Sequence, residues 1–322
     1  IGTSYSWVDA FQWAMNPDGN PLTTDDMPDV INNSFYVGSS AGGGCLASSY
    51  ANLFNAVEAV GIAAVWSAGN AGPNPETITA PKNINTNLVN VWATGNIDGR
   101  SPILPISSSS SRGPSGCGGT GSILIKPEAV APGTSVRSTV PGGGYGFKSG
   151  TSMAAPHVSG AIALLKEAFP QLTGHEIKLA LYYSAQETPA DLADHDPGEE
   201  TGSTSGEDHN YGMGVIDVFN AYRYLRGAAV EPTAFSAFSD YRAPSSMSLT
   251  WMDPTRLMNG DTLYSADFHI YIKRDSVLID SVPGGTRQYT DTGLNDGQEY
   301  FYTIYAVIDS SGATGIETHT SW

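Results

Sequence analysis

The chain has 322 residues and a formal net charge of −17, because 32 Asp and Glu outnumber 15 Lys and Arg. Such an acidic chain repels phosphate backbones and anionic lipid surfaces, so we do not expect nucleic acid as a partner. Hydrophobic residues make up 40% and charged residues 15% of the chain, which is typical of a globular protein. No membrane span is expected either, because Glu58 and Gly61 interrupt an apolar stretch that is already shorter than the roughly 18 residues a span needs.

The first two thirds of the chain alternate apolar strands with amphipathic helices. Strands are predicted at residues 29–34, 62–66 and 88–93. Helices are predicted at 49–60, stopped by Gly61, at 153–168, and from the capping box of Thr173 and Glu176 through residue 184. Strand, helix and strand joined by short links indicate parallel pairing with right-handed crossovers. The fold class expected for residues 1–228 is therefore α/β, with a doubly wound, mostly parallel sheet.

Residues 229–322 have a different texture, with short alternating strands predicted at 247–251, 268–274, 277–282 and 300–308. Trp251 stands where an early core strand is expected, and Tyr300 begins a late strand, as the tyrosine of a tyrosine corner does. This segment resembles a fibronectin type III domain, with an immunoglobulin-like sandwich of another subtype as the alternative. The resemblance implies a C-terminal all-β sandwich. Asp291, followed by Thr292 and Gly293, is interpreted as part of a turn.

The strongest chemical signal is the run SGTSMAAPHVSG at residues 149–160, a glycine-containing turn that leads into an apolar helix. Ser152 would lie at the amino end of this helix, where the macrodipole and free N–H groups favour an oxyanion beside the hydroxyl. A second run, SAGNAGP at residues 67–73, follows the strand predicted at 62–66. Three further runs are SSRGP at 110–114, KPEAVAPG at 126–133 and YGMGVID at 211–217.

Together these motifs resemble the subtilisin-like serine proteases (subtilase family, peptidase S8), closest to the bacillopeptidase F-like branch. The resemblance implies that Ser152 is the nucleophile and that Asn70 donates to the oxyanion. It implies protein or peptide substrates, laid in extended form beside two short segments. The substrate-binding residues expected in these segments are Ser34, Phe35 and Tyr36, and Ser67, Ala68 and Gly69.

The family places a catalytic Asp and a catalytic His before the Ser, yet no histidine of this chain precedes Asn70. His157 is interpreted as structural, because five residues along a helix turn it away from Ser152. We therefore expect the segment with the Asp and His to lie upstream. Since a serine hydroxyl without a base is a weak nucleophile, the chain alone is expected to be nearly inactive. The alternative is a non-catalytic subtilisin-like protein for binding or adhesion.

The resemblance also implies an extracellular, secreted protein that requires no cofactor. The acidic stretch at residues 191–208 is interpreted as a solvated surface loop, with a structural calcium ion as the alternative and no metal ligand assigned. Cys45 and Cys117 are the only cysteines, and their spacing alone is compatible with a disulfide or with two free thiols.

Overall fold

The computed structural model describes residues 6–20, 22–35, 48–190, 207–240 and 242–322. It divides into two compact units, Ile1–Ala221 and Tyr222–Trp322, and each is considered by itself. Within the described residues, no helix is both long enough and apolar enough to cross a bilayer.

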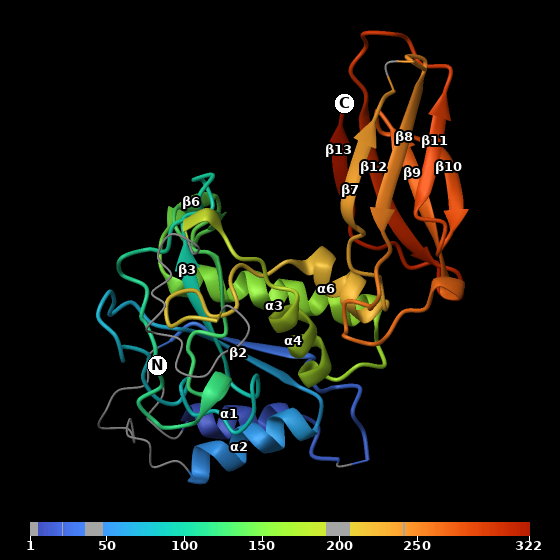
Figure 1. Cartoon of the computed structure of the whole chain (residues 1–322). Helices are drawn as coiled ribbons and strands as arrows, with labels where there is room; N and C mark the ends of the chain where they lie inside the picture. The colour runs from blue at the N-terminus through green and yellow to red at the C-terminus, as the bar shows by residue number, and fades with distance from the viewer. Residues whose placement is uncertain (1–5, 21, 36–47, 191–206, 241) are drawn as a thin grey trace. The chain divides into compact units, whose positions relative to one another are not determined.

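A parallel sheet forms the centre of the first unit (Figure 1). Its strands β1 (Val30–Asn33), β2 (Ala63–Ser67), β3 (Trp92–Ile97) and β4 (Ala129–Pro132) lie in the order β1-β2-β3-β4. All three pairings are parallel, as the strand–helix–strand pattern predicts. The two central strands are buried along their whole length, whereas β1 at the edge is only partly buried.

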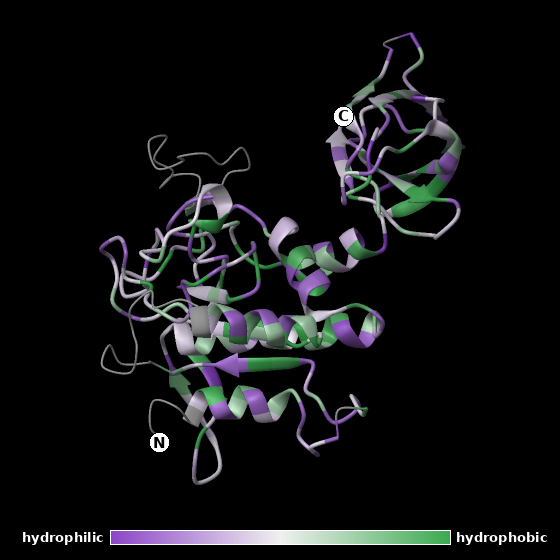
Figure 2. Ribbon diagram, turned by 90° about the horizontal axis from the view of Figure 1, so that it is seen from below, coloured by the Kyte–Doolittle hydropathy of each residue, from purple (hydrophilic) through white to green (hydrophobic). Residues whose placement is uncertain are grey.

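Helices cover both faces of this sheet. In Figure 1, α1 (Ser6–Ala14) and α2 (Ser48–Ala59) lie on one side of β2, and α3 (Thr151–Ala168), with α4 (Gly174–Tyr183) packed against it, on the other. The predicted helices at 49–60, 153–168 and 174–184 are confirmed to within two residues at each end. Figure 2 shows that these helices carry both hydrophilic and hydrophobic residues along their length. Phe54 of α2 and Trp66 of β2 are fully buried together, so this face of the sheet holds an aromatic core.

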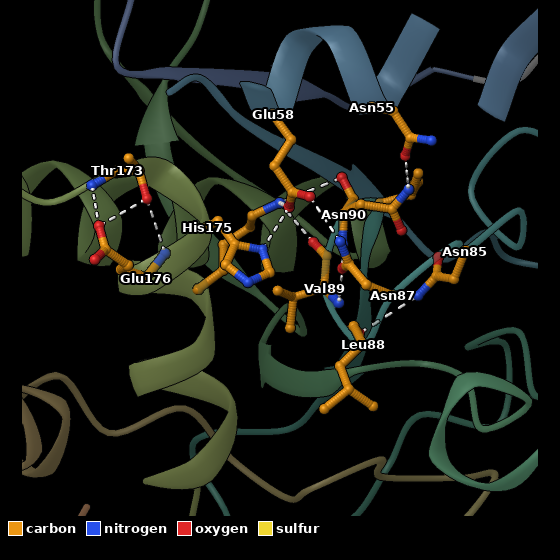
Figure 3. A network of polar contacts seen from close by, with 12 residues as sticks. Asn55, Glu58, Asn85, Asn87, Leu88, Val89, Asn90, Thr173, His175 and Glu176 are labelled. Carbon is orange, nitrogen blue, oxygen red and sulfur yellow. Dashed lines mark hydrogen bonds and ion pairs between the residues drawn. The ribbon is translucent and has the colours of Figure 1, made fainter. Parts of the chain in front are cut away.

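Strand β3 begins at Trp92, whereas the apolar run predicts a strand from residue 88. The backbone before Trp92 is bound by side chains instead of by a neighbouring strand. Asn87 Oδ1 accepts hydrogen bonds from the N–H groups of Val89 at 3.0 Å and Asn90 at 2.8 Å. The carbonyl oxygens of Val89 and Asn90 accept from the ammonium of Lys178 at 2.5 and 3.2 Å. Figure 3 shows this polar network, which turns an apolar segment into a loop.

The same network joins α2 to α4. Glu58 of α2 accepts hydrogen bonds from His175 at 2.8 Å and from the buried Lys178 at 3.3 Å. Thr173 and Glu176 form the predicted capping box at the start of α4 (Figure 3). The sequence pattern located this cap because a capping box is a local interaction, but it did not reveal the ion pair to Glu58.

The second unit contains two antiparallel sheets (Figure 1). One has the order β11-β8-β7, formed by Gln288–Thr292, Ser246–Met252 and Thr233–Phe238. The other has the order β10-β9-β12-β13, formed by Val277–Pro283, Phe268–Arg274, Phe301–Ile308 and Thr318–Ser321. Trp251 of the first sheet and Ile270 and Tyr302 of the second belong to one buried cluster, so the two sheets share a core.

Asp291 lies in strand β11 and not in a turn, so its predicted setting is wrong. Its neighbours alternate between the two faces of the strand, and Asp291 points inward and is buried. Arg274 donates to both carboxylate oxygens at 3.0 and 2.9 Å, and the Tyr302 hydroxyl donates at 2.8 Å. Asp is uncommon in β-strands, but these partners compensate its buried charge and so explain its presence at this position.

Candidate active site

Ser152 is the second residue of α3 and is half-buried. Gly150 precedes the helix with φ of 143°, a conformation that places the chain in a sharp turn before the first helical residue. In the described part of the chain, the backbone N–H of Ser152 donates to no acceptor, as expected in the first turn of a helix. The residue therefore combines a hydroxyl with a free N–H at the positive end of the helix dipole.

Asn70 follows β2 and is fixed against the start of α3. Its side-chain Oδ1 accepts hydrogen bonds from the N–H of Thr151 at 3.0 Å and from the Thr151 hydroxyl at 3.2 Å. The N–H of Gly69 donates to the same hydroxyl at 3.1 Å. The bonds from Thr151 to Oδ1 fix the orientation of the amide, and its Nδ2 has no acceptor among the described residues. The site thus offers two unused donors, Asn70 Nδ2 and the Ser152 N–H, as an oxyanion hole requires.

Gly150 is required where these elements meet. A Cβ atom built on it would lie 3.3 Å from Asn70 Oδ1, and its φ belongs to the region that favours glycine. Any other residue would strain the backbone of the turn, and its Cβ would come into close contact with the Asn70 side chain. This close approach brings Asn70, which follows β2, against the start of α3.

Ser34 contacts Ser152 directly. Its hydroxyl donates to the Ser152 carbonyl at 3.0 Å, and Ser152 Oγ lies 3.5 Å from the Ser34 carbonyl. Phe35 is 42% exposed, with its ring centroid 5.1 Å from that of Trp66. Tyr36, the third residue expected in this segment, lies outside the described residues. The structure therefore brings Ser34 to Ser152 and leaves the Phe35 ring accessible beside it.

The second segment expected to bind substrate contributes little side-chain surface. Ser67 and Ala68 are buried in the sheet, and only Gly69 is partly accessible. Their side chains cannot reach a peptide, so any contact from this segment is made by the backbone near Gly69. Strand β2 is buried on both faces, so it hides side chains that the sequence motif alone does not distinguish from accessible ones.

A hollow of about 300 Å³ opens beside Ser152. It is lined from α3 by Ser152, Met153, Pro156 and His157, and from β5 (Val136–Thr139) by Val136, Arg137 and Ser138. Strand β5 pairs with β6 (Tyr145–Lys148) in a hairpin that the sequence analysis did not predict. Arg137, which lines this hollow, was not predicted as a site residue, although its segment leads directly into the turn before Ser152.

No described histidine is hydrogen bonded to Ser152. His157 lines the hollow, but its Nδ1 lies 2.9 Å from the Met153 carbonyl one turn back along α3. His175 contacts Glu58, the buried His209 Nδ1 has no hydrogen-bond partner in the described part of the chain, and His269 and His319 lie in the second unit with partners of their own. His195 lies outside the described residues. The described residues thus bring together the Ser152 hydroxyl and two unused N–H donors, with no base hydrogen bonded to that hydroxyl.

The acidic stretch at 191–208 falls outside the described residues except for its last two members. Glu207 accepts a hydrogen bond from Ser122 at 2.5 Å, and Asp208 accepts from the N–H groups of Asn210 and Tyr211. Among the described residues, no cluster of three or more His, Cys, Asp or Glu has metal-binding geometry. Cys117 is disulfide-bonded, and Cys45 lies outside the described residues.

Comparison with known proteins agrees with this geometry. The family model described as Subtilase family matches residues 2–214. Bacillopeptidase F of Bacillus subtilis (strain 168) is 33% identical over 229 residues, which are 68% of this chain and 14% of that protein. Subtilisin of Bacillus pumilus is 27% identical over 215 residues, 66% of this chain and 61% of that protein. The solved structure of S41 psychrophilic protease is 26% identical with a TM-score of 0.50, and the match covers 67% of this chain and 64% of that one.

The chain spans less than two thirds of these relatives, so it carries only part of their length. The family model nevertheless covers more than half of the chain, including Asn70 and Ser152. The match also agrees with the parallel sheet and with the turn that presents Ser152 at the start of α3. The chain therefore belongs to the subtilase family of serine peptidases.

Proposed function

We propose that this chain is part of a serine endopeptidase that cleaves proteins or peptides through an acyl-enzyme. The observation that carries the proposal is that hydrogen bonds from Thr151 to the Asn70 side chain hold Asn70 next to Ser152, the residue that follows Thr151. Ser152 Oγ attacks the carbonyl carbon of the scissile peptide bond. The oxyanion that forms is bound by Asn70 Nδ2 and the Ser152 N–H. Because catalysis proceeds through protein groups, it requires no cofactor, and a calcium ion at the acidic stretch would be structural.

We further propose that a segment upstream of residue 1 supplies the Asp and the His. Within the described residues, β1 pairs with β2 on one side only, so its other edge is available for another strand. An apolar hollow of about 260 Å³ lies beside it, lined by Trp7, Phe11, Trp13, Ile31 and Phe35 among others. Trp13 in this hollow is 64% exposed, which is unusual for a tryptophan. These features support a further segment packed against β1.

Without that segment the chain is expected to be nearly inactive. Removing the base from a serine, histidine and aspartate unit costs about 10⁶-fold in kcat, and the oxyanion hole alone leaves about 10³- to 10⁴-fold acceleration over water. The triad acts as a unit, because the hydroxyl must lose its proton as it attacks. The intact donors at Ser152 and Asn70 therefore do not suffice for ordinary turnover.

A fluorophosphonate probe tests the proposal, because it labels a serine only when a base activates the hydroxyl. The complete protein, carrying its upstream segment, should be labelled at Ser152, and Ser152→Ala should abolish labelling. The chain alone should be labelled at least about 10³-fold more slowly. Unlabelled Ser152 in the complete protein would instead favour a non-catalytic protein for binding or adhesion.

For the second unit we propose a fibronectin type III-like sandwich that acts as a spacer. The Tyr300 hydroxyl accepts a hydrogen bond from the N–H of Asn295 at 2.9 Å, which is the contact of a tyrosine corner. Trp251 is buried between the two sheets. We also propose that the protein is extracellular, since the disulfide at Cys117 suits an oxidising compartment. The 33% identity to bacillopeptidase F supports the bacillopeptidase F-like branch.

A further inference from the structure

Lys82 places a buried ammonium beside Gly69, in the segment that leads from β2 to Asn70. The residue is 4% exposed. Its Nζ lies 3.2 Å from the point that a Cβ atom on Gly69 would occupy, and Ser111 Oγ lies 2.8 Å from the same point. The ammonium thus fills room that exists because residue 69 has no side chain. Gly69 directly precedes Asn70, and its N–H is bonded to Thr151, the neighbour of Ser152.

This ammonium has no counter-ion, unlike the other buried lysines of the first unit. Lys126 is paired with Glu128, and Lys178 is paired with Glu58. In the part of the chain that the structure describes, Lys82 has neither a carboxylate nor a hydrogen-bond acceptor. Burial lowers the pKa of Lys82 to about 8, so the group still carries its charge at neutral pH.

An uncompensated buried charge destabilises a protein, and such charges are normally paired. The position of this one beside a site that binds peptide indicates that a ligand provides the missing partner. The ammonium is not completely sealed from solvent, in contrast to the indole N–H of Trp66. A carboxylate that approached the ammonium from the accessible side of Gly69 would therefore find an unpaired positive charge.

We propose that Lys82 binds the side-chain carboxylate of a Glu or Asp residue on the amino side of the scissile bond. The inference rests on the proposed function. The carbonyl of that residue is the group attacked by Ser152, and its oxyanion lies at Asn70. Its side chain therefore starts next to Asn70 and projects along Gly69 toward the Lys82 ammonium. The buried ammonium then completes an ion pair that forms only when an acidic substrate is bound.

Two peptide anilides that differ only in this residue, Glu in one and its neutral isostere Gln in the other, test the inference in the complete protein. We expect kcat/KM to favour Glu at least about tenfold, the range expected for a hydrogen bond to a buried charge. Lys82→Met should remove the preference and retain hydrolysis of the Gln peptide. Lys82→Arg should keep a preference for Glu. Lys273→Met, which removes a positive charge from the second unit, should leave the ratio unchanged.

The outcomes separate this inference from the proposed function. Fluorophosphonate labelling of Ser152 together with equal rates on the two peptides would overturn the inference alone. A Glu preference that survives in Lys82→Met would also overturn it, because another group would then bind the carboxylate. Absence of labelling would overturn the proposed function and the inference with it.

Discussion

Replacing Lys82 by Met should stabilise the first unit near neutral pH. Methionine keeps most of the apolar stem in place and removes the ammonium that has no counter-ion. Lowering the pKa of Lys82 from 10.5 to about 8 on folding corresponds to about 3 kcal/mol, at about 1.4 kcal/mol per pH unit. We therefore expect Lys82→Met to raise the free energy of unfolding by up to about 3 kcal/mol near pH 7, less whatever the imperfect fit of methionine costs.

The pH dependence follows from the direction of this change. Below about pH 8 the lysine is charged in both the folded and the unfolded chain, so the full cost of the buried charge is present. Between about 8 and 10.5 the folded chain has lost the proton and the unfolded chain still binds it, so stability rises with pH. The advantage of Lys82→Met over the unsubstituted chain should therefore shrink as the pH rises from about 7 to about 10.

Amide hydrogen exchange in β2 and β3 measures this stability in the first unit separately from the second. Lys148→Met is the matched control, because Lys148 is an exposed lysine on β6, and its removal should change the stability by less than about 0.5 kcal/mol. An Lys82→Met chain that is no more stable than the unsubstituted chain near pH 7, or whose advantage is independent of pH, would refute the argument that the ammonium lacks a partner.

Three further predictions concern other contacts. Gly150→Ala should destabilise the first unit by about 1–3 kcal/mol and slow fluorophosphonate labelling of the complete protein. The control Gly160→Ala, at an open position on α3, should be neutral or slightly stabilising, and equal effects of the two substitutions would contradict the strain argument. Glu58→Gln should destabilise the chain at neutral pH. Burial opposes ionisation of Glu58, but its contacts with Lys178, His175 and Asn87 outweigh burial and lower its pKa. In urea unfolding, the loss of stability relative to the unsubstituted chain should be present above about pH 4.5 and should fade at lower pH, where the carboxyl protonates. Asp291→Asn should lower the stability of the second unit in urea unfolding by about 1–3 kcal/mol, since it breaks a partly buried ion pair to Arg274. Glu317→Gln, which breaks the more exposed ion pair to Lys273, should lower it by less than about 1 kcal/mol. Similar losses of stability in the two variants would show that burial of the ion pair does not matter.

The sequence by itself determined the elements whose signals are local. The periodicity of residues 49–60 and 153–168, the stop at Gly61 and the capping box at Thr173 each depend on neighbours within a few positions. The family motifs indicated roles for Ser152 and Asn70. The sharp turn before α3 is equally local, because Gly150 must adopt a φ that other residues avoid. These features could be predicted because the interacting groups lie close together along the chain.

Only the tertiary structure decided how distant segments use the same residues. The late start of β3 depends on Lys178, far along the chain, which binds two carbonyl groups that a strand would have used. The inward position of Asp291 depends on Arg274 and Tyr302 from another sheet. Whether a buried lysine is paired, as Lys178 is, or unpaired, as Lys82 is among the described residues, depends on which carboxylates the fold brings near it. Charge compensation is a property of three-dimensional neighbours, and a linear sequence does not specify those neighbours.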